Sequence, residues 1–233
     1  MSKLFGNPTF RIQMRDNDDN ILRQWKNDEI DITVNVVCKP CNEGWMSDLE
    51  EEHARPAMSE MILGHSVPSL DSSRAKAIAR FACKTAMVVD YMRPADTSFF
   101  TKSDRLRFSD SLSIPNQLQV FLACFSPGVS GRLHAFRYSD YPDFEDILSV
   151  YVCTYGVGRL IFQVVAAKFP IGFPSFYPIA GFEHLAIPLY PELPTDISWP
   201  LPNFIADRAH FEGFSTRWSS IGIPQWWIDE RDS

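Results

Sequence analysis

The sequence predicts an α+β protein, and three observations support this fold class. Residues 73–92 place small and aliphatic side chains at helical spacing, which indicates a long amphipathic helix. Residues 118–190 contain β-branched and aromatic segments separated by Pro, Gly, Ser and Asp, which is typical of strands joined by turns. The chain has 233 residues, of which 45% are hydrophobic, and can bury one sizeable core with at most a small appendage. We therefore expect helices packed on an antiparallel β-meander.

The first part of the chain contains two predicted strands ahead of a cysteine turn. Residues 9–14 and 21–25 are the candidate strands, and the polar residues between them favour a turn. The apolar residues 34–37 predict a third, short strand. This strand leads directly into the one Cys-x-x-Cys of the sequence, formed by Cys38 and Cys41.

A helix is expected to follow the cysteine turn. Ser47 and Glu50 have the spacing of a capping box, in which each side chain binds the other residue's backbone amide. Pro56 should end or reset this helix, because proline suits the first turn of a helix better than its interior. Three apolar residues near its start are expected to anchor it on the apolar face of the 73–92 helix: Trp45, Met46 and Leu49.

Two further helices are predicted downstream, and both have capping residues. Asp71 or Ser72 is expected to cap the helix at residues 73–92. Thr101 and Asp104 form a capping-box variant at the start of a shorter helix, residues 101–112.

A stripe of basic side chains follows the polar side of the 73–92 helix. Lys76, Arg80 and Lys84 are spaced at i, i+4 and i+8, so they stack on one side. Such a stripe is usually a solvated helix face, and the alternative is contact with nucleic-acid phosphates. These three residues are our candidate nucleic-acid-binding surface.

The second half of the chain predicts five strands and a final helix. The best hairpin candidate surrounds Gly156 and Gly158, because glycine is common in tight turns between strands. The C-terminal helix is expected at residues 202–218, where apolar residues recur at helical spacing. The predicted strands are residues 119–125, 133–138, 148–155, 159–168 and 184–189.

The composition restricts the function and the compartment. The net charge of −7 disfavours strong non-specific binding to nucleic acid, since Lys and Arg supply most of that affinity. No apolar run approaches the roughly 20 residues needed to cross a bilayer, and the N-terminus lacks the apolar segment of a signal peptide. Five cysteines, an odd number, fit reduced thiols in the cytoplasm. We expect no membrane association and find no motif for a small-molecule cofactor.

The cysteine turn and the residues after it resemble the second half of the HNH endonuclease module of bacterial proteins. The resemblance implies a zinc-bearing ββα unit in which Cys38 and Cys41 supply half of the zinc ligands. It also implies that Asn42 stands where the family helps to hold a catalytic divalent ion, which would be Mg²⁺ in an active nuclease. The shared string is CxxCNxGWMSxLE, here Cys38, Cys41, Asn42, Gly44, Trp45, Met46, Ser47, Leu49 and Glu50.

The first half of that module has no counterpart in this chain. The family carries another Cys-x-x-Cys and a Glu-His pair ahead of the shared string, whereas residues 1–37 contain neither cysteine nor histidine. A structural zinc site almost always has four protein ligands, so we expect zinc well below one per chain. We also expect Asn42, without its partners, to cap the turn.

Two functional hypotheses follow from a chain that resembles the second half of the module and lacks the first half. In the first, the chain is an HNH endonuclease-like protein that is catalytically incomplete, or one whose start lies upstream and restores the missing half. In the second, it is a non-enzymatic protein-interaction module that keeps the cysteine turn as a structural element. The partner is accordingly nucleic acid or protein. Residues 1–65 are expected to form the truncated HNH-like unit, and residues 66–233 an α+β domain.

Overall fold

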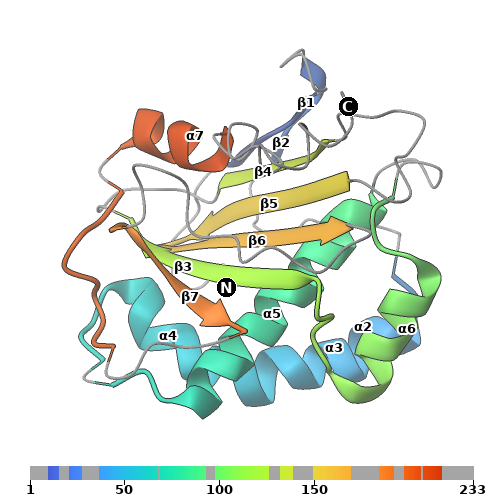
Figure 1. The fold of residues 1–233 in the computed structure, drawn as a ribbon, viewed down its shortest axis with the longest axis horizontal. Helices are drawn as coiled ribbons and strands as arrows, with labels where there is room; N and C mark the ends of the chain where they lie inside the picture. Colours follow the sequence, from blue (N-terminus) through green and yellow to red (C-terminus); the bar gives the residue numbers. More distant parts are fainter. Residues whose placement is uncertain are drawn as a thin grey trace, which may run out of the picture.

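The α+β class is confirmed, with helices packed against an antiparallel sheet. Figure 1 shows helices on both sides of the sheet, most of them below it. The structure is a computed structural model, and it describes residues 10–15, 21–27, 37–67, 69–92, 98–125, 132–138, 149–168, 184–191, 197–205 and 207–216.

The N-terminal strands form a hairpin of their own. β1 (Phe10–Arg15) pairs antiparallel with β2 (Ile21–Asn27), as the sequence predicts. Of the further strand expected at residues 34–37, only Val37 lies within the described residues, and it occupies a bend. The other three residues of that prediction lie outside the described part of the chain.

The helical region begins at the cysteine turn, earlier than expected. It runs through α2 (Lys39–Glu43), α3 (Trp45–Asp48), the π-helical segment η1 (Leu49–Ala54) and α4 (Arg55–Leu63). The capping box expected at Ser47 is therefore wrong, because Ser47 lies inside α3. The N-cap is Cys38, whose thiol accepts a hydrogen bond from the Cys41 amide. Pro40 favours this early start, since proline fits the first turn of a helix.

Pro56 resets the helix without ending it. The π-helical turn of η1 passes into α4 at Arg55, and Pro56 stands in the first turn of α4. A proline cannot donate the usual i→i−4 bond, and its ring displaces the carbonyl of residue i−4. The wider π turn directly before Pro56 accommodates that displacement.

The next two helices agree with the sequence analysis. α5 (Ser72–Tyr91) is capped by Asp71, whose carboxylate accepts from the Arg74 amide at 2.8 Å. α6 (Lys102–Ser111) begins with the predicted capping box of Thr101 and Asp104. Local side-chain hydrogen bonds fix both helix starts, so neighbouring residues sufficed to predict them.

Among the described residues, the main sheet contains five strands, all paired antiparallel in the order β4-β5-β6-β3-β7. The strand order corrects the expected meander, because β3 lies between β6 and β7. All seven β3 residues are buried, and a strand that is apolar on both faces is favoured away from a solvated sheet edge. The bounds are β3 (Leu118–Cys124), β4 (Arg132–Tyr138), β5 (Ser149–Val157), β6 (Leu160–Lys168) and β7 (Ala186–Tyr190).

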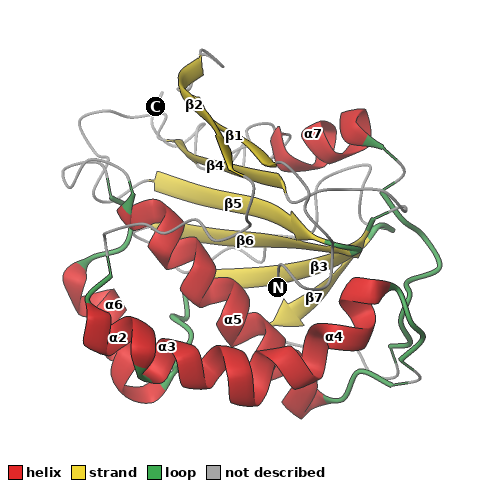
Figure 2. Cartoon of the chain, turned by 180° about the vertical axis from the view of Figure 1, so that it is seen from behind, coloured by secondary structure: helices red, strands yellow, loops and turns green. Residues whose placement is uncertain are grey.

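Alternate side chains of the sheet belong to two separate cores. Leu122 and Phe162 point to the core shared with α4 and α5, and Ile161 and Val165 point to the core covered by α7 (Arg208–Thr216). Figures 1 and 2 show, from opposite sides, α4 and α5 on one face of the sheet and α7 on the other. The first core extends along the chain from Leu49 to Leu201, so α3, η1 and α4 pack with the later elements. The expected domain boundary at residue 65 stays a prediction.

The C-terminal helix is shorter than expected at residues 202–218. α7 begins at Arg208, and before it Ile205 forms an isolated bridge with Phe125, in which the Ile205 backbone amide donates to the Cys124 carbonyl. Upstream, Trp199 pairs with Val67, and its indole donates to the Met61 carbonyl at 3.2 Å. None of the described helices combines the length and apolar character needed to cross a membrane.

Candidate functional site

The Cys38–Cys41 turn places two thiols in direct contact at the surface. The Sγ atoms lie 2.7 Å apart, and the Cys41 amide donates to the Cys38 sulfur at 3.4 Å. Cys38 is exposed and Cys41 is half-buried. Short-range geometry within one helical turn, rather than distant packing, therefore brings the two sulfurs together.

Gly44 closes the turn and allows the chain to continue into α3. Its amide donates to the Pro40 carbonyl at 3.0 Å. A Cβ atom added to Gly44 would lie 2.7 Å from that same oxygen, closer than real Cβ contacts come. A residue with a side chain would push α2 and α3 apart, and only glycine permits this approach.

The shared hydrogen bond makes the two thiols chemically unequal. The Cys41 thiol, followed by the Cys41 amide, lowers the pKa of Cys38, because both donate to the ionised sulfur. The same hydrogen bond between the two thiols raises the pKa of Cys41, and burial and the charge on Cys38 raise it further. The indole of Trp45 opposes the rise in the Cys41 pKa. Cys38 is thus the thiol that ionises more readily.

The donor set of the turn does not fit a closed zinc site. Two thiolates supply half of a tetrahedral set. Among the residues that the structure describes, no three His, Cys, Asp or Glu side chains gather closely enough to hold a metal ion. Asn42 is exposed in α2, and its backbone amide donates to the Cys38 carbonyl at 3.0 Å. The cap expected at Asn42 is provided by Cys38 instead.

The basic stripe on α5 does not form one exposed face. Lys84 is only 8% exposed and forms an ion pair with Glu50 of η1. Arg80 donates from Nε to the Leu112 carbonyl at 2.9 Å. Lys76 alone of the three is an exposed residue. Two of the candidate phosphate-binding cations are therefore engaged within the fold.

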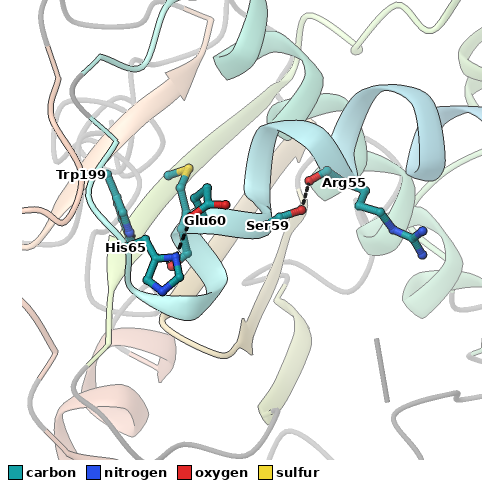
Figure 3. Close-up of polar contacts among 6 residues, drawn as sticks. Arg55, Ser59, Glu60, His65 and Trp199 are labelled. Carbon is teal, nitrogen blue, oxygen red and sulfur yellow. Dashed lines mark hydrogen bonds and ion pairs between the residues drawn. The ribbon is translucent and has the colours of Figure 1, made fainter. Parts of the chain in front are cut away.

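A histidine–carboxylate pair at the end of α4 was not anticipated from the sequence. His65 Nδ1 lies 2.6 Å from Glu60 Oε2, and both side chains are more than half exposed (Figure 3). The pair forms because Gly64 takes a left-handed conformation, with φ at 80°, and turns the chain back over the helix. The signal in the sequence is Gly64 itself, a typical helix C-cap.

A buried carboxylate was also missed by sequence reasoning. Asp90 at the end of α5 is fully buried. It accepts hydrogen bonds from the Ser98 hydroxyl at 2.7 Å and from the amides of Phe99 and Phe100 at 3.0 and 2.9 Å. These donors satisfy both of its oxygens, so Asp90 joins α5 to the chain before α6.

Comparison with known proteins identifies no relative of this chain. No protein-family model matches the chain, and no match was found among curated proteins or among solved structures.

Proposed function

We propose that this chain is an HNH endonuclease-like protein that is catalytically incomplete, and that its cysteine turn and following helix serve a structural role. The observation that carries the proposal is the placement of Leu49. This residue of the shared string is 1% exposed and belongs to the main core, next to elements far along the chain. The helix that would present catalytic groups in a nuclease is here a core-forming element.

The missing general base supports the catalytic part of the proposal. Hydrolysis of a phosphodiester near neutral pH gains typically 10²–10⁴-fold from a positioned base. In the family that the chain resembles, a histidine ahead of the shared string takes this role, and residues 1–37 contain no histidine. Of the family's site residues, Cys38, Cys41 and Asn42 remain.

A second candidate, a protein-interaction module in the cytoplasm, is favoured by the internal use of Arg80 and Lys84. Binding to a nucleic-acid backbone needs several exposed cations. The Lys84 ammonium is paired with Glu50, and the Arg80 guanidinium with a backbone carbonyl. The net charge of −7 acts in the same direction. All five cysteines are thiols rather than half-cystines, in keeping with a reducing compartment.

A nuclease assay tests the first proposal. We expect no cleavage of plasmid or single-stranded DNA when the purified chain is incubated with Mg²⁺ or Mn²⁺. The control is Asn42→Ala, prepared identically, which separates activity of the shared string from contamination. Cleavage by the unmodified chain that Asn42→Ala abolishes would show an intact catalytic module and refute the proposal.

Binding measurements separate the two candidates. We expect the fluorescence anisotropy of labelled duplex and single-stranded DNA to show no salt-dependent change when the chain is added. The variant Lys76→Gln removes the exposed cation of the stripe, and Lys39→Gln removes an exposed cation elsewhere as a matched control. Binding that falls with Lys76→Gln but not with Lys39→Gln would favour a nucleic-acid partner over a protein partner. Elemental analysis of the same samples should give zinc well below one per chain.

A further inference from the structure

We propose that Cys38 and Cys41 form a thiol–disulfide exchange pair that reacts with low-molecular-weight disulfides such as oxidised glutathione. In this pair Cys38 is the attacking thiol and Cys41 is the resolving thiol. The activity goes beyond the proposed function and does not depend on it. Its basis is the contact between the two sulfurs at the surface of the protein.

The geometry of the turn suits formation of a bond between the two cysteines. A disulfide needs sulfurs about 2.05 Å apart on residues whose side chains face each other. The Sγ atoms are already 2.7 Å apart and belong to the first turn of α2, so a small side-chain movement joins them. Gly44 keeps this turn closed, because its backbone amide donates a hydrogen bond to the Pro40 carbonyl.

Exposure and hydrogen bonding assign the two roles. Cys38 is exposed, and its sulfur accepts a hydrogen bond from the Cys41 backbone amide. The Cys41 thiol also lies within hydrogen-bond distance of that sulfur. A thiol attacks a disulfide only where the disulfide can reach its sulfur, so the more exposed sulfur reacts first. Cys41 is partly covered, so an incoming disulfide meets Cys38 first, and Cys41 is placed to attack Cys38 afterwards.

The exchange proceeds in two balanced steps. The Cys38 thiolate attacks one sulfur of oxidised glutathione, a mixed disulfide forms at Cys38, and one glutathione leaves as a thiolate that takes up a proton. Cys41 then loses its proton to solvent and attacks Cys38 Sγ, which releases the second glutathione. The two cysteines are oxidised by two electrons, and one glutathione disulfide is reduced to two thiols.

The remaining cysteines provide an internal contrast. Cys83, Cys124 and Cys153 are all buried in the cores of the protein. A buried thiol reacts slowly, because reagents do not reach it and its ionised form is disfavoured. Oxidation in the folded chain is therefore expected to be confined to the turn.

Mass spectrometry after thiol trapping tests the pair. The full chain is equilibrated with mixtures of reduced and oxidised glutathione, unreacted thiols are alkylated, and peptides are mapped. We expect one intramolecular disulfide between Cys38 and Cys41, with the three buried cysteines alkylated only after unfolding. In Cys41→Ser we expect a glutathione adduct that persists at Cys38, because the resolving thiol is gone.

The variant Cys38→Ser completes the assignment. Its adduct at Cys41 should form about tenfold more slowly than the adduct at Cys38 in Cys41→Ser. The matched control, Cys83→Ala, removes a buried thiol and should react as the unmodified chain does. Thermal melting by circular dichroism verifies that each variant is folded.

Four results would overturn the proposal. The first is a chain that keeps both thiols reduced at every glutathione ratio. The second is a chain that forms disulfides between two copies in place of the internal one. The third is equal adduct rates in the two serine variants, which would remove the assigned roles. Zinc at one equivalent per chain that protects both thiols from alkylation would also overturn it.

Discussion

Lys84 is a charged side chain that the fold places in its interior. It is paired with Glu50, and its ammonium lies 5.0 Å from the centre of the Phe81 ring. The i+4 spacing predicts that Lys84 lies on the same side of the helix as Lys76, but this fails over the two steps from Lys76 to Arg80 and from Arg80 to Lys84. Four residues advance a helix by about 400°, so each step drifts about 40° around the axis. By Lys84 the stripe has reached the side of α5 that η1 covers.

The Glu50–Lys84 pair should stabilise the folded state measurably. Glu50→Gln removes the carboxylate and leaves a mostly buried ammonium, at a cost of about 1–2 kcal/mol in the free energy of unfolding. This value lies between those of exposed and fully buried pairs, since the Glu50 side chain is 46% exposed. Urea unfolding of Glu50→Gln, Lys84→Met and the double variant measures the coupling between them.

A neighbouring ion pair provides the control for that cycle. Glu51 pairs with Arg55 on the surface, where both side chains are about half exposed or more. Glu51→Gln should therefore change the free energy of unfolding by less than about 0.5 kcal/mol. An equally small effect of Glu50→Gln would show that the buried pair contributes no more than a surface pair.

Among the secondary-structure elements, the helical run after the cysteine turn packs in a way the sequence predicted only in part. Leu49 packs into the core shared with α5, as expected, whereas the Trp45 ring contacts Phe108 of α6 edge-on at 5.8 Å between ring centres. Trp45 is only partly buried. Leu49 rather than Trp45 is therefore the main anchor of this element.

Truncating Leu49 should destabilise the whole chain and not only its own helix. Leu49→Ala removes a buried side chain from a shared core, at a cost of about 2–5 kcal/mol. The matched control is Leu63→Ala, at an exposed position in the same run of helices, which should cost less than about 0.5 kcal/mol. Circular dichroism should show one cooperative transition at a lower temperature. A separate early transition for the helices would mean that they form an independent unit.

The helix starts show which local signals determine structure and which do not. Thr101 with Asp104 and Ser47 with Glu50 both match a capping pattern, and the second pair has the more usual residue types. Only the first pair forms, because the chain is already helical before Ser47: α2 begins at Lys39, and α3 begins at Trp45 directly after Gly44. A capping pattern marks a possible start, and upstream residues decide whether the chain is already helical there.

The candidate site was predictable in composition but not in chemistry. The spacing of Cys38 and Cys41 sufficed to predict two thiols at one turn. Which of them accepts hydrogen bonds, and which is more exposed, depends on the backbone path through Pro40 and Gly44. Likewise, the pairing of Lys84 with Glu50 depends on how η1 lies on α5, a non-local arrangement.

Over the whole molecule, the strands were predicted but their order was not. Each strand shows its own pattern of β-branched and aromatic residues, so its existence can be inferred locally. Pairing of β3 with β6 joins Leu118 to Ala166 across a long stretch of chain. The sequence contains one clue, since β3 is apolar at nearly every position and is thereby suited to the interior of a sheet.

The buried thiols and phenol should make the protein less stable at alkaline pH. Burial raises the pKa of Cys83 and of Tyr155 far above their usual values, so both stay protonated in the folded state. In the unfolded chain they ionise near pH 8.5 and about 10. Their contribution to stability is complete below those values and is lost as the pH rises, because only the unfolded state releases the protons.

Urea midpoints between about pH 7 and pH 10 measure this loss. The measurements belong in a Cys38→Ser, Cys41→Ser background, which removes the titration and oxidation of the exposed pair. Adding Cys83→Ala should reduce the fall in stability between about pH 7 and pH 10 by about 2 kcal/mol. A fall of unchanged size would assign the alkaline sensitivity to other groups.

The position of β3 within the sheet has a consequence for synthesis on the ribosome. β3 ends at Cys124, whereas its neighbours β6 and β7 begin only at Leu160 and Ala186. A chain made from its N-terminus therefore releases this apolar strand before either partner has been translated. Both hydrogen-bonding edges of β3 are open during that interval, and an open apolar strand pairs readily with other chains. Slower translation between residues 124 and 160 should consequently increase aggregation of the nascent protein.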